Sequence, residues 1–184
     1  MILFGSIPEL EPLNQILLAV LVTIAAAFDI RFRRIPNWLN LIGLLLGLIA
    51  NAYLAELQGL GRSALGVAVG FGLYFPLFLL HARGAGDVKL LAAVGAIAGP
   101  QGCFAIFLVS AVLGGFVAIV LLIFKKRLRK TLWNVGFILK DLSRFKTPFT
   151  ANPELDVNNP ESLRLPHGAV IALGVYLFLA ISRA

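Results

Sequence analysis

The chain has 184 residues, of which 59% are hydrophobic and 14% are charged, and its net charge is +7. Soluble domains carry about 25% charged residues, so the composition excludes an ordinary soluble protein and predicts a protein whose outer surface contacts lipid. The length predicts a single domain, residues 1–184. The 16 Lys and Arg residues do not indicate nucleic-acid binding, because basic residues in membrane proteins mark cytoplasmic loops. A single cysteine, Cys103, excludes an intrachain disulfide and a Cys-based zinc cluster.

Apolar segments of about 17–25 residues are typical of membrane-spanning helices. The sequence predicts an all-α, polytopic membrane protein with six such helices, at residues 13–28, 38–54, 63–80, 88–99, 103–124 and 165–182. The fourth segment is short enough to be a re-entrant or buried helix. A helix that is enclosed by its neighbours, however, need not match the full thickness of the bilayer.

The distribution of basic residues favours a fourth segment that crosses the membrane. With six crossings, one side of the membrane receives nearly all basic residues, and the other receives only Arg62 and Arg183. The basic side holds Arg31, Arg33, Arg34, Arg83, Lys89 and nine basic residues between positions 125 and 164. The positive-inside rule therefore predicts that this side is cytoplasmic and that both termini lie outside.

Residues 125–166 form the one long polar segment. In its first half, apolar residues recur every three or four positions between basic ones. This pattern predicts an amphipathic helix, which either lies on the cytoplasmic leaflet or packs on the cytoplasmic face of the bundle. Residues 147–160 are rich in Pro and Asn and are expected to be irregular.

Two carboxylates lie at boundaries of the predicted helices. Asp29 follows the first apolar segment, and Asp87 begins the fourth. The predicted topology places both at the cytoplasmic ends of their helices. An isolated Asp would be interpreted as a helix cap or, for Asp29, as the partner of Arg31 or Arg33. Two Asp residues at one membrane depth shift the balance towards a functional role, because ionisable groups near a membrane are costly.

Two carboxylates a few ångströms apart cannot easily both ionise, so one of them keeps a proton at neutral pH. The ionised one acts as a general base on a water molecule, and the protonated one polarises a carbonyl and later protonates a leaving amine. Gly84 and Gly86 precede Asp87 and leave side-chain-free backbone where a substrate strand could approach, although they also fit an ordinary loop. Lys89 could tune Asp87 or bind lipid phosphate, although a topology signal explains it equally simply.

Two motifs resemble one known family. The segment from Gly84 to Leu91, GAGDVKLL, is similar to the G-x-G-D-x-K-L signature of type IV prepilin peptidases. The segment from Asp29 to Asn37, DIRFRRIPN, resembles the first-aspartate motif of that family, D-x-R-x-x-x-I-P-N, which includes Arg31 and Pro36. The sequence LPHG at residues 165–168 is compatible with the resemblance.

The resemblance implies an aspartyl endopeptidase with Asp29 and Asp87 as the catalytic pair. Such enzymes remove the short basic leader of prepilins, whose apolar helix stays in the bilayer, on the cytoplasmic side of the inner membrane. The long bacterial members also carry a cytoplasmic insertion with paired cysteines and methylate the new N-terminus. Eight residues separate Ile30 from Leu39 here, with no paired cysteines, so the chain resembles the short branch that serves Flp-type pili, or the archaeal peptidases.

Two other classes of function remain open from the sequence. Paired membrane carboxylates also serve proton relays, so a small proton- or ion-coupled carrier is an alternative, although carriers hold their acidic groups near the midplane. A non-catalytic assembly scaffold is a third possibility. No cofactor is expected, and His81 and His167 have no neighbours at the spacing of metal ligands.

Overall fold

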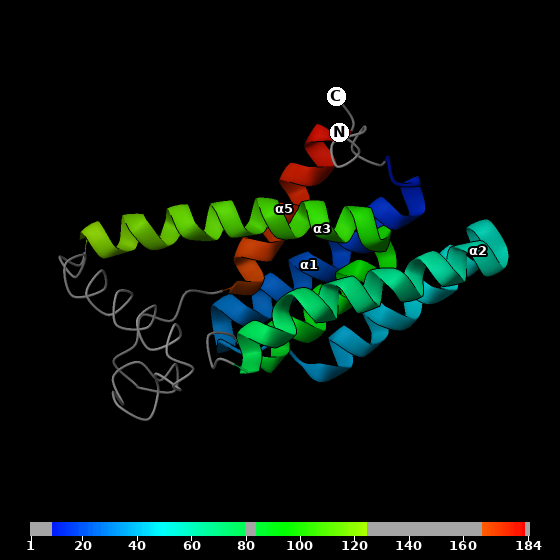
Figure 1. The fold of residues 1–184 in the computed structure, drawn as a ribbon. Helices are drawn as coiled ribbons and strands as arrows, with labels where there is room; N and C mark the ends of the chain where they lie inside the picture. Colours follow the sequence, from blue (N-terminus) through cyan, green and yellow to red (C-terminus); the bar gives the residue numbers. More distant parts are fainter. Residues whose placement is uncertain (1–8, 80–83, 125–166, 183–184) are drawn as a thin grey trace, which may run out of the picture. The chain divides into compact units, whose positions relative to one another are not determined.

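The computed structural model describes residues 9–79, 84–124 and 167–182, and these residues are helical with no strand among them (Figure 1). The helices are α1 (Pro12–Phe32), α2 (Asn37–Leu79), α3 (Ala85–Phe124) and α5 (His167–Ile181). The all-α prediction therefore holds for the described residues. The amphipathic helix and irregular segment predicted within residues 125–166 lie outside them.

The chain divides into two compact units. Residues 1–113 and 166–184 form the first unit, and residues 114–165 form the second. The described part of the second unit is the last stretch of α3, residues 114–124. Both aspartates and all the contacts discussed below belong to the first unit.

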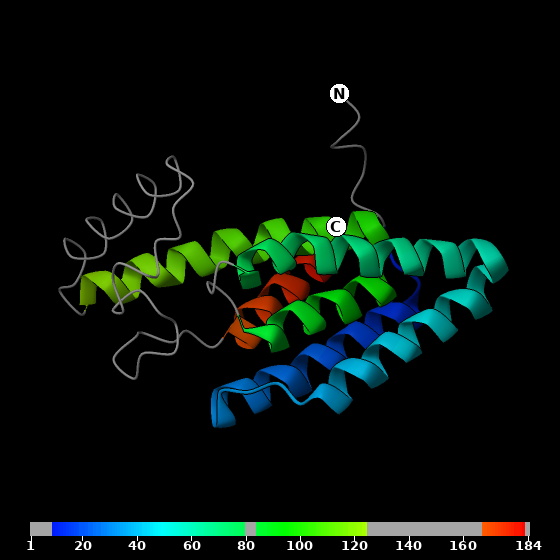
Figure 2. The same cartoon turned by 60° about the horizontal axis from the view of Figure 1, so that its bottom comes forward.

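Helix α2 contains a sharp break that separates two arms, residues 37–54 and 57–79. Ala55 (φ −144°, ψ 28°) and Glu56 (φ 49°, ψ −133°) leave helical geometry, and the chain reverses its direction there (Figure 2). The sequence predicted separate helices at 38–54 and 63–80 with a longer connection. The predicted length of this connection is wrong, because helical structure resumes directly after Glu56 and includes residues 57–62.

Helix α3 also has two arms, residues 85–98 and 100–124, which meet at Gly99. Gly99 has φ 73° and ψ 178°, a conformation that side chains with a Cβ rarely adopt. Pro100 follows, and its missing amide hydrogen is compatible with the start of a new helical arm. The break lies at the predicted boundary between the fourth segment, residues 88–99, and the fifth, residues 103–124.

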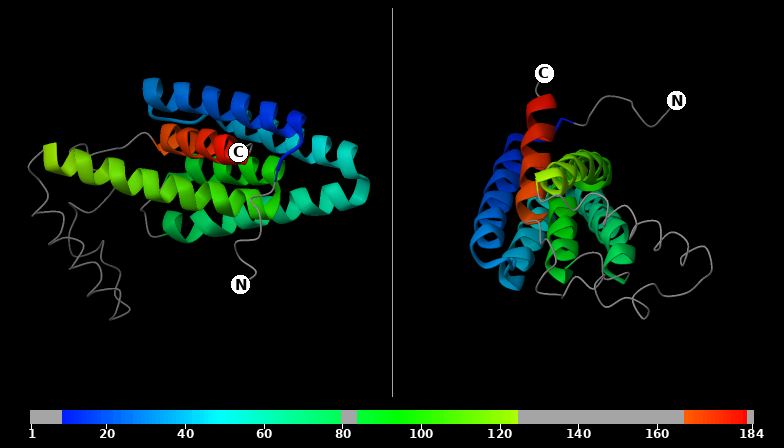
Figure 3. Two further views of the ribbon diagram at one scale, coloured as in Figure 1. Left: turned by 90° about the horizontal axis from the view of Figure 1, so that it is seen from above. Right: turned by 90° about the vertical axis from the view of Figure 1, so that its left-hand side faces the viewer.

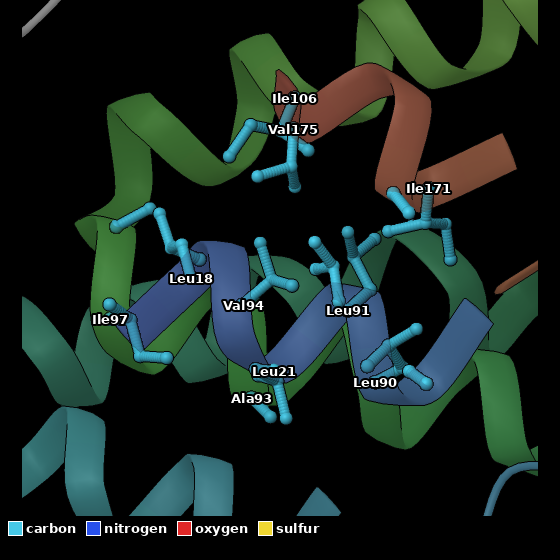
Figure 4. Packing of buried hydrophobic residues seen from close by; sticks show 14 of the residues in the cluster. Leu18, Leu21, Leu90, Leu91, Ala93, Val94, Ile97, Ile106, Ile171 and Val175 are labelled. Atoms are coloured by element: carbon cyan, nitrogen blue, oxygen red, sulfur yellow. The ribbon is translucent and has the colours of Figure 1, made fainter. Parts of the chain in front are cut away.

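The first arm of α3 forms the centre of the first unit. Its residues 90–98 are buried, and Leu90, Leu91 and Val94 have no exposed surface. Figure 4 shows these side chains packed with residues of α1, of α5 and of the second arm of α3, which include Leu18, Leu21, Ile106, Ile171 and Val175. The end-on view in Figure 3 shows the arm between neighbouring helices. The fourth segment is thus enclosed by its neighbours, as a helix too short to match the full bilayer would need to be.

Glycines allow the second arm of α2 to lie directly on this central arm. A Cβ at Gly66 would collide with the backbone carbonyl of Gly95, and a Cβ at Gly70 would collide with that of Leu91. Small residues permit such close approach of helix backbones in lipid. Gly72, by contrast, has open space where its Cβ would lie.

Polar contacts fix the end of the unit that lies away from both aspartates. The Asn51 amide donates to the carbonyl of Ala96 at 2.8 Å, and the Asn14 amide donates to the Asn51 side-chain oxygen at 3.1 Å. Asn51 thus joins α1, α2 and α3. Because such groups have no water partner in lipid, their hydrogen bonds within the protein hold helices together.

Among the residues that the structure describes, three helices are long and apolar enough to cross a membrane: α1, α2, and α3 as far as Leu121. Helix α5 is apolar but shorter. Large apolar side chains on the outer faces of α1 and α2, such as Ile16, Val20 and Ile49, are exposed, as lipid contact requires. The number of six crossings and the outside location of the termini stay predictions.

Gly66→Val tests the helix contact between α2 and α3. The valine side chain has no space against the Gly95 carbonyl, so we expect the variant to lose about 1–3 kcal/mol of stability and to unfold at a lower temperature in detergent. Thermal unfolding followed by circular dichroism measures this. Gly72→Val is the matched control, and an equal loss of stability in both variants would contradict the packing described here.

Candidate active site

Asp29 lies buried in the last turn of α1. Its side chain is 8% exposed, and its backbone carbonyl accepts a hydrogen bond from the Arg33 amide at 2.8 Å. Arg33 has left-handed backbone geometry (φ 53°) and ends the helix. The Asp29 carboxylate therefore faces the interior of the first unit at the end of α1. After Arg33 the chain continues into the connection to α2.

The side-chain partner of Asp29 comes from the far end of the sequence. The Gly168 amide, in the first turn of α5, donates to Asp29 Oδ2 at 2.6 Å. Helix α1 packs along α5, which brings these two residues, 139 positions apart, together. Of the two arginines that the sequence offers as partners of Asp29, Arg33 interacts electrostatically with its carboxylate, whereas the Arg31 guanidinium lies 5.6 Å from the centroid of the Phe32 ring.

Asp87 lies in the first turn of α3 and is partly exposed. Its amide donates to the Gly84 carbonyl at 3.1 Å, and a Cβ at Gly84 would lie 3.9 Å from Asp87 Oδ2. The Asn40 side chain of α2 approaches the same turn, because its amide donates to the Gly86 carbonyl over a long 3.4 Å. The backbone around Asp87 is thus fixed from its own helix and from α2.

Ile35, in the short connection between α1 and α2, links the surroundings of the two aspartates. Its side chain is buried. A Cβ at Gly168 would lie 3.2 Å from Ile35 Cδ1, and a Cβ at Gly86 would lie 3.5 Å from Ile35 Cβ. The residue bonded to Asp29 and the residue preceding Asp87 therefore both border one isoleucine side chain.

The four helix termini that carry these residues lie at one end of the first unit. Figure 2 shows the end of α1 beside the starts of α2, α3 and α5. Both aspartate-bearing turns lie at this end, and their common membrane depth stays a prediction. Four of the described basic residues, Arg31, Arg33, Arg34 and Lys89, are at this end and are exposed.

Two further residues of the predicted motifs also meet here. The Lys89 ammonium donates to the Asn37 side-chain oxygen at 2.9 Å, which joins the start of α3 to the start of α2. Pro36 directly precedes α2, and its carbonyl accepts from the Asn40 amide. Lys89 therefore has a specific partner within the protein. Its interpretation as a topology signal alone did not predict this contact.

Sequence reasoning missed three residues of this end: Ile35, Asn40 and Gly168. Ile35 belongs to the motif that begins at Asp29, and Gly168 belongs to the segment LPHG. The motifs therefore included both residues, but the sequence did not indicate what either one does. Asn40 carried no signal, because its contact with Gly86 depends on how α2 packs against α3. Within the described ranges, no three His, Cys, Asp or Glu side chains gather where a metal ion could bind.

The comparison with protein families gives one match. Residues 16–119, more than half of the chain, match the model of the type IV leader peptidase family. The chain belongs to the type IV leader peptidase family. No curated protein and no solved structure matches the chain.

Membership of the type IV leader peptidase family identifies the chain as a protease with membrane helices. Both aspartate motifs, residues 29–37 and 84–91, lie inside the matched range, and the recognised resemblance is thereby confirmed. Helix α5 (His167–Ile181) lies outside the matched range.

The hydrogen bond between Asn37 and Lys89 is tested by a double-mutant cycle. Asn37→Ala and Lys89→Met each remove the bond, so we expect each to cost about 0.5–1.5 kcal/mol of stability and the double variant to cost less than the sum. Thermal unfolding of the four proteins in detergent measures the coupling. Arg31→Met combined with Asn37→Ala is the control, and strictly additive effects for Asn37 and Lys89 would show that the bond is absent.

Proposed function

We propose that the chain is an aspartyl endopeptidase that removes the leader peptide of type IV, Flp-like prepilins at the cytoplasmic face of the inner membrane. The observation that carries the proposal is the convergence of both aspartate motifs on Ile35 at one end of the helices. Asp29 and Asp87 are the proposed catalytic pair. Gly84, Gly86, Lys89, Arg31, Pro36 and Asn37 are the proposed supporting residues.

The proposed reaction is hydrolysis of one peptide bond. The ionised aspartate takes a proton from a water molecule, whose oxygen attacks the scissile carbonyl carbon. The protonated aspartate hydrogen-bonds the carbonyl oxygen, which carries the developing negative charge, and a proton then passes to the leaving amine as the carbon–nitrogen bond breaks. Because the two carboxyl groups share protons, the roles of base and acid belong to the pair and are not assigned to one aspartate each.

The different surroundings of the two aspartates fit such a reaction. Asp29 is buried and hydrogen-bonded, which gives it a fixed position, whereas Asp87 is partly exposed beside side-chain-free backbone. A substrate strand needs access from the cytoplasm, and the exposed Gly84 leaves space for it next to Asp87. A substrate whose apolar helix stays in lipid would present its basic leader at this depth.

The cytoplasmic location of the site is supported by charge. The described residues at this end include Arg31, Arg33, Arg34 and Lys89, whereas the other end carries Glu9, Glu11 and Arg62. The positive-inside rule assigns the basic end to the cytoplasm. The Flp-like branch is supported by the short connection from α1 to α2 and by the single cysteine of the chain.

Asp29→Asn and Asp87→Asn test the proposal. Each substitution keeps the shape of the side chain but removes the ionisable group, so we expect leader removal to fall at least about 10³-fold with normal amounts of folded protein. Co-expression with candidate prepilins, followed by N-terminal sequencing of the product, measures cleavage. Glu9→Gln, at the opposite end, is the matched control and should cleave normally. Normal processing by either Asp variant would exclude the assignment.

A further inference from the structure

We propose that Gly168 is a positioning residue of the reaction, which holds the Asp29 carboxylate in place through its amide and leaves room for it through its missing side chain. This inference rests on the proposed function. It extends that function to α5, a helix that lies outside the range matched by the family.

The place of Gly168 in α5 makes its amide available to a side-chain acceptor. The first amides of a helix have no intrahelical acceptor, and Gly168 is the second residue of α5. Its N–H donates to Asp29 Oδ2 at 2.6 Å in a buried position. A carboxylate at a helix N-terminus is also favoured by the helix dipole. The bond therefore satisfies a backbone donor and restricts rotation of the Asp29 side chain.

The surroundings of Gly168 leave little room for a side chain. A Cβ at position 168 would lie 3.0 Å from Asp29 Cβ and 3.1 Å from Asp29 Oδ2. Both distances are shorter than ordinary van der Waals contact. A side chain at this position would therefore press on Asp29 and shift its carboxylate by a few tenths of an ångström from its observed place.

Helix α5 is packed against its neighbours along its length, which holds it beside Asp29. Ile171 and Val175 are completely buried, and Phe178 is 1% exposed. Gly174, farther along α5, lies so close to Ser110 that a Cβ would collide with the hydroxyl. Because α5 is fixed along its length, an added methyl group at Gly168 displaces the carboxylate rather than the helix.

Gly168→Ala tests the positioning role, with Gly174→Ala as its matched control. Both add one methyl group to a crowded position of α5, but only position 168 borders Asp29. We expect kcat for leader cleavage to fall at least about 10-fold in Gly168→Ala, because small misplacements of catalytic groups have large effects, with KM within about twofold. Gly174→Ala should keep its kcat per folded molecule even where its thermal stability falls.

A second pair of variants separates the effect on Asp29 from general crowding. The new methyl group would also lie 3.2 Å from Ile35 Cδ1, and Ile35→Val removes that carbon atom. We expect Gly168→Ala with Ile35→Val to stay as impaired as Gly168→Ala, because the contacts with Asp29 remain. Recovery of kcat in the double variant would overturn the positioning role.

The role of the amide itself is tested by Gly168→Pro, since proline has no N–H and is tolerated in the first turn of a helix. We expect its kcat to fall at least as far as that of Gly168→Ala. Wild-type kcat in either Gly168 variant, with Asp29→Asn inactive in the same assay, would overturn this inference and leave the proposed function standing. Normal cleavage by Asp29→Asn would overturn the proposed function instead.

Discussion

The arrangement of this protein depends on one buried carboxylate that is held by a backbone amide. An ionisable group away from water is costly unless it is hydrogen-bonded, and Asp29 is 8% exposed. The Gly168 amide provides its hydrogen bond at 2.6 Å. The amide belongs to the first turn of α5, and Asp29 belongs to the last turn of α1. The bond therefore requires the end of α1 to lie beside the start of α5.

The connection between α1 and α2 extends this constraint to the second aspartate. Arg33 ends α1 in left-handed geometry, and the chain then places Ile35 between Gly168 and Gly86. The bonds from Asn40 to Gly86 and from Lys89 to Asn37 join α2 to the start of α3. A few residues of one short connection thus determine how both aspartate-bearing turns are placed, while the central arm of α3 supplies the packed core behind them.

The sequence predicts those features of the fold that have a local cause. The apolar composition indicates helices in lipid, Pro36 and Asn37 predict the start of α2 (Asn37–Leu79), and Pro100 predicts the break in α3. The apolar runs that border Asp29 and Asp87 predict aspartates at helix ends. The connection before Ser63 was wrong, because Ala55 and Glu56 alone reverse the chain and residues 57–62 stay helical.

The support of the candidate site could not be predicted, because it consists of contacts between distant parts of the chain. Gly168 and Asp29 are 139 positions apart, and nothing in the segment LPHG indicates that its glycine borders a carboxylate. Asn40 and Ile35 look like ordinary residues of a helix and a connection. Their roles depend on the packing of α2, α3 and α5, which periodicity and motifs do not specify.

The proposed catalysis requires that the side chains at positions 29 and 87 face a common space at one end of the helices. Replacing Cys103 by Ser, and both aspartates by Cys, allows a direct test in native membranes with a short bifunctional thiol reagent. We expect efficient intramolecular cross-linking between positions 29 and 87, and none between positions 29 and 11 in the matched variant with Glu11→Cys. Absence of the cross-link between positions 29 and 87, with both thiols reactive towards a monofunctional reagent, would contradict the account.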